Sequence, residues 1–262
     1  MIRRFLLGAA IAVTAAVTLP LVAPVAHAQE AAAEPELLKG DWSFSGIFGT
    51  IDKASAQRGL QIYKEVCSNC HGLYEMSYRN IGGLGYSEAQ VTNFAAAFQV
   101  ADTNDDGAAV QRPAKPSDRF IRPFPNEKAA RAANNGAYPP DLALIVKARE
   151  GGVNYVYSLM QGYKEAPADV KLADGQYYNA YFAAGGQKIG MPQPLTDGAV
   201  TFADGAPNDL KSEAHDIATF LAWAAEPEQD ARKRLGVRVM LFLIVLTGAL
   251  YYAKRKIWAN IH

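Results

Sequence analysis

The sequence has 262 residues and no formal net charge at pH 7, because 26 basic residues balance 26 acidic ones. Half of the residues are hydrophobic, and the length is sufficient for one domain with a sizeable core. The charge is unevenly distributed, since all 26 acidic residues but only 17 basic ones lie within 29–231. That segment carries a net charge of −9, which attracts basic partners and disfavours binding to nucleic acid.

Residues 1–28 have the pattern of a secretory signal peptide. Arg3 and Arg4 precede an apolar run over 5–25, and Ala26-His27-Ala28 supplies a small-x-small cleavage site. We therefore predict that an exported, periplasmic domain occupies 29–231. The alternative is that the first segment is retained as a membrane anchor.

A second apolar segment lies near the C-terminus. Residues 239–253 carry no charge, and basic residues flank them on both sides. A span needs about 20 residues to cross about 30 Å of hydrocarbon, so we predict a transmembrane anchor at 232–258 and a cytoplasmic tail at 259–262. A buried core helix is the alternative. The flanking basic clusters are nearly balanced, so the predicted sidedness rests on the signal peptide.

Apolar spacing predicts a mostly helical domain with long loops. Residues 29–53 are expected to lie over this domain, with Trp42 among the packing side chains, and Ser55 is the expected cap of the first helix. No segment has a strand pattern long enough to assign, and 101–125 and 164–210 are expected to be loops. Helical spacing marks 54–70, 79–100, 126–134, a stretch starting at 139, 154–163 and 213–225.

Residues 102–107 imitate the start of an EF-hand calcium loop. The twelfth position of such a loop should be Glu, but here it is Pro113. We therefore interpret this segment as a solvated acidic loop.

Cys67-Ser68-Asn69-Cys70-His71 matches C-x-x-C-H, the attachment motif for a c-type haem. One helical turn would place both sulfurs on one side, toward the two haem vinyl groups, and the next residue would place its imidazole at the iron. A redox dithiol and half of a zinc site are the alternatives. The first lacks its strand context, and the second lacks any further cysteine, so the motif predicts one covalently attached haem c.

Met191 is the best candidate for the sixth iron ligand. It lies in a loop with Gly190 and two prolines, and a thioether favours ferrous iron. Met76, Met160, His215 or no ligand at all are the alternatives. Ligation by His and Met leaves no position for substrate, which favours electron transfer over peroxidase or oxygen chemistry.

Arg149 is a candidate partner for a haem propionate through a bidentate charged hydrogen bond. A simple surface arginine is an equally good interpretation of this residue.

Together these motifs resemble the cytochrome c1 family, the haem subunit of the bacterial cytochrome bc1 complex. The resemblance covers nearly the whole chain after residue 28, including the anchor. It is densest at 67–71, 131–137, 139–142, 145–152, 155–159, the Met191 loop, 220–223 and 226–227.

The resemblance implies a class I cytochrome c-like haem domain with one C-terminal transmembrane helix, and Met191 as the sixth ligand. It implies that electrons pass from a Rieske iron–sulfur protein to a soluble cytochrome c, with cytochrome b as the membrane partner and quinol chemistry left to other subunits. A stand-alone anchored cytochrome, a haem peroxidase and a haem-based sensor are the alternatives. It also implies haem-pocket roles for Asn134, Ala137, Pro139, Pro140, Ile145, Arg149, Tyr155, Leu159, Met160, Phe182, Ile189 and Pro194.

Some bacterial relatives have an extra disulfide near the haem. This chain has only two cysteines, and the haem motif uses both of them. Its pocket is therefore expected to depend on packing and hydrogen bonds alone. The loop 101–118 varies within the family, so the resemblance implies no role for it.

Overall fold

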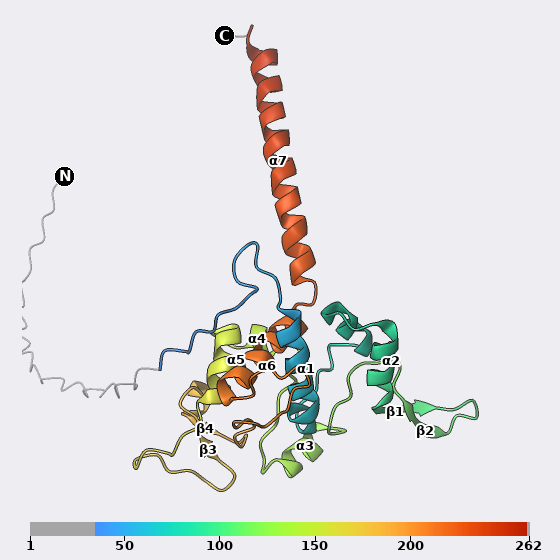
Figure 1. Cartoon of the computed structure of the whole chain (residues 1–262), viewed down its shortest axis with the longest axis vertical. Helices are drawn as coiled ribbons and strands as arrows, with labels where there is room; N and C mark the ends of the chain where they lie inside the picture. The colour runs from blue at the N-terminus through green and yellow to red at the C-terminus, as the bar shows by residue number, and fades with distance from the viewer. Residues whose placement is uncertain (1–34, 261–262) are drawn as a thin grey trace, which may run out of the picture. The chain divides into compact units, whose positions relative to one another are not determined.

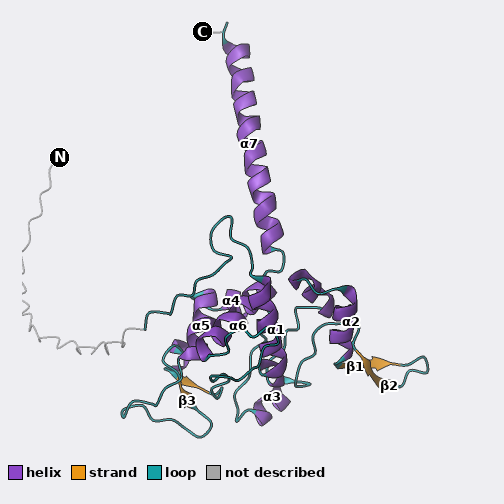
Figure 2. Cartoon of the chain, in the orientation of Figure 1, coloured by secondary structure: helices purple, strands orange, loops and turns teal. Residues whose placement is uncertain are grey.

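The computed structural model describes residues 35–260, and the predicted signal peptide at 1–28 lies outside this range. The described chain is mostly helical and has two short two-stranded sheets, which confirms the predicted fold class (Figures 1 and 2). Its α-helices are α1 (Lys53–Glu65), α2 (Glu88–Ala96), α3 (Glu127–Ala133), α4 (Ile145–Ala148), α5 (Gly152–Gln161), α6 (Leu210–Ala225) and α7 (Gln229–Trp258).

Helices α1 and α6 form the centre of the core, although 144 residues separate their nearest ends in the chain. Gly59 allows them to approach closely, because a Cβ at this position would lie 2.2 Å from the Asp216 carbonyl oxygen. Leu60 and Phe220 are almost fully buried beside this crossing. Helix α5 packs against α6 and completes the hydrophobic core.

The first helix differs from its prediction at both ends. Asp52, not Ser55, is the N-cap, because its carboxylate accepts hydrogen bonds from the backbone N–H groups of Ala54 and Ser55. The α-helix ends at Glu65, and the cysteine motif lies on a 3₁₀ turn, η1 (Cys67–Asn69). The prediction of a continuous helix over 54–70 was therefore wrong by about one turn.

The expected helix over 79–100 is divided into two helices and the start of a strand. A 3₁₀ helix, η2 (Tyr78–Leu84), ends at Gly85, which has φ = 101°, a conformation that glycine adopts without strain. Helix α2 then begins with a capping box between Ser87 and Gln90. The glycines that interrupt the pattern therefore separate the two helices.

The acidic loop contains a hairpin that was not predicted. Strands β1 (Gln99–Thr103) and β2 (Ala109–Pro113) pair antiparallel, with Asp102 opposite Val110. Because most of their side chains are exposed, the strands lack the alternation of buried and exposed residues that marks a strand in sequence.

Three of the remaining helix predictions are close and one is wrong. Helix α5 lies two residues before the expected 154–163. Helix α3 follows the expected bounds, with Asn126 as its N-cap. Helix α6 begins three residues earlier than expected, at Leu210, with Asp209 as its N-cap. The helix expected from Pro139 instead starts at Ile145, because Asp141 uses its carboxylate to accept bonds from Tyr74 and Ala143.

The loop region 164–210 contains a small sheet and a 3₁₀ turn. Strand β3 (Tyr177–Tyr178) pairs with β4 (Lys188–Ile189), and η3 (Ala183–Gly185) lies between them. This sheet positions the start of the Met191 loop.

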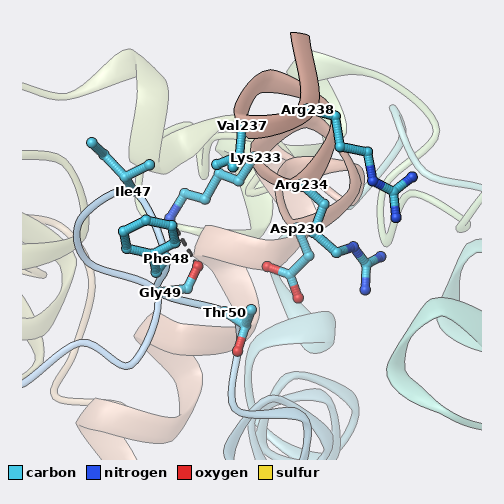
Figure 3. Close-up of a pocket in the computed structure, with 9 residues that line it drawn as sticks. All are labelled: Ile47, Phe48, Gly49, Thr50, Asp230, Lys233, Arg234, Val237 and Arg238. Carbon is cyan, nitrogen blue, oxygen red and sulfur yellow. Dashed lines mark hydrogen bonds between the residues drawn. The ribbon is translucent and has the colours of Figure 1, made fainter. Parts of the chain in front are cut away.

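Helix α7 contains the predicted anchor and extends it by three residues toward the N-terminus. Its best 18-residue window has a mean hydropathy of 1.9, and none of that window is buried by the rest of the chain. By length and composition it is able to cross a membrane. Its first turns are tied to the segment before α1, because Lys233 donates to the carbonyl oxygens of Phe44 and Gly49 (Figure 3).

Candidate haem site

The cysteine motif forms a compact turn. The backbone N–H groups of Cys70 and His71 both donate to the Cys67 carbonyl oxygen, at 3.1 and 2.9 Å. Both cysteines are half-buried, and neither forms a disulfide. Burial, together with repulsion from Cys70, raises the pKa of the Cys67 thiol to about 12. The turn thus brings two free thiols and an imidazole together, which is the donor set that covalent haem attachment requires.

The imidazole of His71 is held through one of its two nitrogens. Its Nδ1 lies 2.7 Å from the Pro140 carbonyl oxygen, and because a carbonyl only accepts, Nδ1 carries the proton. This tautomer leaves Nε2 with a lone pair for a metal, as in most metal-binding histidines. Burial lowers the pKa of His71, which favours the neutral form that binds metals.

The segment that carries Pro140 is fixed against the residues that follow the haem motif. The N–H of Leu142 donates to the Gly72 carbonyl oxygen at 2.8 Å, and the N–H of Tyr74 donates to the Asp141 carboxylate at 2.8 Å. In addition, the Tyr63 hydroxyl donates to the His71 carbonyl oxygen at 3.0 Å. These three bonds fix the backbone around His71 and around Pro140, and so hold the imidazole in place indirectly.

The Met191 loop lies against the same segment. A Cβ on Gly190 would lie only 2.7 Å from the Cβ of Ala137, so the two backbones are in close contact there. The Tyr163 hydroxyl donates to the Met191 carbonyl oxygen at 3.0 Å. Met191 itself is half-buried and packs against the hydrophobic core. The fold therefore brings together the chain segments of both predicted iron ligands.

The other predicted pocket residues divide into two groups by burial. Ile145, Met160 and Ile189 are buried in the domain. Asn134 donates to the Ala130 carbonyl oxygen at 2.7 Å and ends α3. The remaining members are half-buried and mostly apolar or aromatic: Ala137, Pro139, Pro140, Tyr155, Leu159, Phe182 and Pro194.

Arg149 is exposed, and its guanidinium donates to the Ala148 carbonyl oxygen at 3.3 Å. It also interacts with the Tyr155 hydroxyl, which partly offsets the effect of burial in raising the pKa of that tyrosine. Arg149 thus lies beside another predicted pocket residue, and its role toward a propionate stays a prediction.

Comparison with known proteins defines the family. The model of the Cytochrome C1 family matches residues 42–261. The chain belongs to the cytochrome c1 family. It is 44% identical to cytochrome c1 of Rhodospirillum rubrum over 242 residues, covering 86% of this chain and 88% of that protein. It is 46% identical to mitochondrial cytochrome c1 of Saccharomyces cerevisiae over 222 residues, covering 84% and 71%.

The cytochrome b/c1 of Bradyrhizobium diazoefficiens is also similar, with 47% identity over 244 residues. The match covers 84% of this chain but only 35% of that longer protein. Cytochrome c1 is the haem subunit of the bc1 complex, so this chain is a haem protein of electron transport. Its helix α7 makes it a single-pass membrane protein of that family.

Two polar residues that sequence reasoning missed organise this cytochrome c1 site. Asn179 is fully buried, and its amide donates to the Leu159 carbonyl oxygen at 2.7 Å while accepting from the N–H of Tyr181 at 3.0 Å. Tyr163 holds Met191, as described above. The signal for Asn179 was its position as a lone amide in the aromatic run 177–182, where a buried polar group requires partners.

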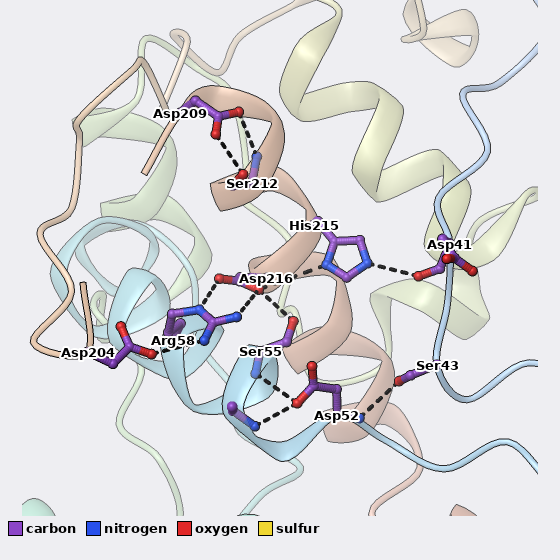
Figure 4. Close-up of polar contacts among 11 residues, drawn as sticks. Asp41, Ser43, Asp52, Ser55, Arg58, Asp204, Asp209, Ser212, His215 and Asp216 are labelled. Carbon is purple, nitrogen blue, oxygen red and sulfur yellow. Dashed lines mark hydrogen bonds and ion pairs between the residues drawn. The ribbon is translucent and has the colours of Figure 1, made fainter. Parts of the chain in front are cut away.

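A second polar cluster lies on the α1–α6 face of the domain (Figure 4). Asp216 is 4% exposed, and it accepts hydrogen bonds from the Ser55 hydroxyl at 2.6 Å and from Arg58 at 2.6 and 3.2 Å. His215 is half-buried and stacks on Trp42, with ring centroids 4.8 Å apart. Its Nε2 lies 3.1 Å from the Asp41 carbonyl oxygen, so this residue connects the segment before α1 to α6.

Proposed function

We propose that this chain passes electrons from a Rieske iron–sulfur protein to a soluble cytochrome c through one covalently bound haem c. The observation that carries the proposal is the pairing of the two ligand segments, with His71 held at Pro140 and Gly190 packed on Ala137. Cys67 and Cys70 would bind the vinyl groups, and His71 and Met191 would bind the iron. The haem would supply a reversible one-electron couple when bound.

The residues of the chain then have separate tasks. Pro140 fixes the His71 imidazole so that Nε2 stays directed at one position, and Tyr63 holds the His71 backbone. Tyr163 fixes the backbone of Met191. The half-buried residues Leu159 and Phe182 exclude water, which preserves a low dielectric around the redox centre and so tunes its potential. With His71 and Met191 both holding the iron, the site would leave no place for peroxide or oxygen.

The proposed location is the periplasmic side of the bacterial inner membrane. Residues 1–28 would direct export, 29–231 would form the periplasmic domain, and 259–262 would remain in the cytoplasm. Helix α7 is long and apolar enough to span a membrane, and residues 29–231 carry a net charge of −9; both observations support one anchor and one polar domain. Cytochrome b is the proposed neighbour of α7.

A stand-alone membrane-anchored electron carrier is the second candidate function. The observation in its favour is that one chain contains both the ligand segments and an anchor. The discriminating experiment is mild detergent extraction of the membrane followed by affinity purification of this chain. Co-purification of a b-type cytochrome and an iron–sulfur protein at equal stoichiometry supports the complex, whereas a monomeric c-type cytochrome would overturn it.

A spectroscopic test addresses the proposed ligand set independently. If His71 and Met191 fill both axial positions, the spectrum of the reduced protein will not change on addition of carbon monoxide. A reduced spectrum that responds to carbon monoxide would contradict the closed site and favour a peroxidase or a gas sensor.

A further inference from the structure

The segment before α1 forms a loop over 43–51 that is fastened to the first turns of α7 (Figure 3). Lys233 of α7 donates to two carbonyl oxygens of this loop, at 2.5 and 3.1 Å. Asp230 of α7 accepts a bond from the N–H of Ile51 at 3.2 Å. Side chains of α7 therefore hold the loop beside this helix.

The tip of the loop consists of Ile47 and Phe48, between two glycines. Gly46 has φ = 71°, a conformation that glycine adopts without strain. A Cβ on Gly49 would overlap the Ser45 carbonyl oxygen, so the backbone closes tightly on itself after the tip. The two glycines thus permit a sharp turn that presents two apolar side chains at its end.

Both side chains of the tip are highly exposed. Phe48 is 83% exposed and Ile47 is 69% exposed. Within residues 35–260, no other large hydrophobic side chain is as exposed as Phe48, and the highest value in α7 is 72%, at Val245. The apolar side chains of α7 are exposed because their neighbour is lipid. Equal exposure at the tip, which is unfavourable in water, favours the same kind of neighbour there.

The space between the tip and α7 is also apolar. A cavity of about 230 Å³ lies there, and Ile47, Phe48 and Val237 contribute to its wall. Figure 3 shows the guanidinium groups of Arg234 and Arg238 extending from the opposite side of α7, away from the tip. The cavity therefore suits a hydrocarbon chain and offers nothing to a charged group.

The length of the uncharged segment places the tip at the boundary of the hydrocarbon. Residues 239–253 rise about 22 Å along the helix axis, which is less than the roughly 30 Å of a bilayer core. Extending the span toward the C-terminus would bury three successive cations at 254–256. Extending it by four residues toward the N-terminus, to Leu235, includes only Arg238, whose long side chain can reach the headgroups. The hydrocarbon therefore begins near Leu235, at the level of the cavity, whose wall includes Arg234 and Arg238.

We propose that the loop 43–51 is a second membrane-contact element, whose tip inserts Ile47 and Phe48 into the hydrocarbon of the leaflet on the side of the haem domain. The tip and α7 then enter the bilayer side by side, and lipid acyl chains cover the apolar cavity between them. Because Lys233 and Asp230 already hold the loop, little conformational freedom is lost on insertion. A second contact beside the helix restricts how the domain tilts about α7.

Lipid fits this tip better than a protein partner does. The apolar surface of the tip is confined to two side chains, because Ser45-Gly46 precede them and Gly49-Thr50 follow them. A stable protein interface buries about 800 Å² on each partner, far more than two side chains offer. Insertion into a leaflet needs no such area, since the lipid surrounds each side chain. The proposal requires only that α7 spans a membrane, and it is independent of the electron-transfer partners.

The test uses the membrane complex that contains the full chain, reconstituted into phosphatidylcholine vesicles. Phe48→Cys carries a nitroxide label. Electron paramagnetic resonance measures how often the label collides with molecular oxygen, which concentrates in hydrocarbon, and with a nickel chelate, which stays in water. Leu172→Cys is the control, because Leu172 is an exposed apolar residue in the loop between α5 and β3 and does not line the cavity. Wild-type protein treated with the same label gives the background.

We expect the ratio of oxygen collisions to chelate collisions to be several times higher for the label at position 48 than for the label at position 172. Ile47→Cys is a second variant at the tip, and we expect it to give the same high ratio. It keeps the proposal testable if Phe48→Cys does not assemble.

Two results would overturn the proposal. If the ratio at the tip equals the ratio at position 172, the tip lies in water. If the label at the tip collides with neither reagent, a protein subunit covers the tip and lipid does not.

Discussion

Gly190 packs directly against Ala137, so closely that a Cβ on Gly190 would lie 2.7 Å from the Cβ of Ala137. The two residues are 53 positions apart in sequence. Ala137 precedes the Pro140 carbonyl that holds His71, and Gly190 precedes Met191. The contact therefore joins the two segments that carry the proposed iron ligands.

Gly190→Ala is expected to destabilise the domain by about 1–3 kcal/mol, the usual effect of overpacking. The backbone of Gly190 does not have positive φ, so the added methyl group acts through steric contact and not through backbone strain. Denaturant unfolding of the purified protein would measure the loss. Gly82→Ala is the control, because its Cβ would meet only the Val91 side chain at 3.8 Å.

The double variant Gly190→Ala with Ala137→Gly tests the contact itself. Removing the methyl group of Ala137 restores the space, so we expect the double variant to regain part of the stability lost in Gly190→Ala. If the two effects simply add, the contact does not exist in solution.

Met191→Leu is expected to lower the midpoint potential by on the order of 0.1–0.3 V, within the roughly 0.8 V that axial ligands span. Leucine has a similar volume but no sulfur, so packing is preserved while the ligand is lost. A redox titration measures the potential, and carbon monoxide binding reports the opened position. Met76→Leu is a matched control because it makes the same exchange at a buried methionine. Equal potentials in the two variants would refute Met191 as ligand.

The parts of this site that are local in sequence were predictable. The cysteine motif and the apolar span each depend on residues within a few positions, so pattern and propensity are informative there. The N-caps Asn126 and Asp209 are also local signals, but they were not predicted, and α6 was therefore expected to begin three residues too late. Met191 was chosen from the glycine and prolines of its own loop, and the resemblance to a family added most of the proposed pocket.

The contacts that position the ligands were not predictable, because they join distant segments. Nothing near Tyr163 indicates that its hydroxyl bonds to Met191, 28 positions away. Ser55 was expected to cap α1, but Asp52 performs that task and Ser55 instead bonds to Asp216, 161 positions away. In both cases tertiary partners determine which of several local options a polar side chain takes.

Asp216→Asn is expected to destabilise the domain by about 2–3 kcal/mol, because it leaves Arg58 facing a neutral group at a site that is almost fully buried. Asp204→Asn is the control, since Asp204 also pairs with Arg58 but is 51% exposed in its side chain, and we expect less than about 1 kcal/mol. Chemical unfolding at pH 7 measures both. Equal losses would show that burial of Asp216 does not matter.

The lowered pKa of Asp216 predicts that the free energy of unfolding falls in acid. Burial alone would raise the pKa of Asp216, but the nearby His215 imidazole and the hydrogen bonds from Arg58 and Ser55 outweigh it and leave the pKa below the ordinary value. The stabilisation from this lowered pKa is complete above the unfolded-state pKa of about 3.9 and is lost as pH falls through the folded pKa. The wild type should therefore lose more stability below pH 4 than Asp216→Asn does.

The raised pKa of His215 predicts that the free energy of unfolding falls as pH rises near neutrality. Its pKa is raised by Asp216, whose carboxylate lies 3.9 Å from Nδ1, with further support from the Asp41 carbonyl oxygen and from Asp52, while burial opposes them. The stabilisation from a raised pKa is complete below the unfolded-state value of about 6.5 and is lost as pH rises through the folded pKa. His215→Gln should remove this fall in the free energy of unfolding. A wild-type stability that is constant from pH 6 to pH 8 would contradict the predicted shift.

The charge of residues 29–231 predicts how the protein would meet the proposed soluble acceptor. Residues 29–231 carry a net charge of −9, so attraction should accelerate encounter with a basic cytochrome c at low ionic strength. The Debye length falls from about 30 Å at 0.01 M to about 8 Å at 0.15 M salt, and we expect the second-order electron-transfer rate to fall about tenfold across that range. Stopped-flow oxidation of the reduced protein measures this rate. An acidic acceptor is the control, because its rate should rise with salt as repulsion is screened, and a rate to the basic acceptor that is independent of salt would rule out electrostatic docking on this surface.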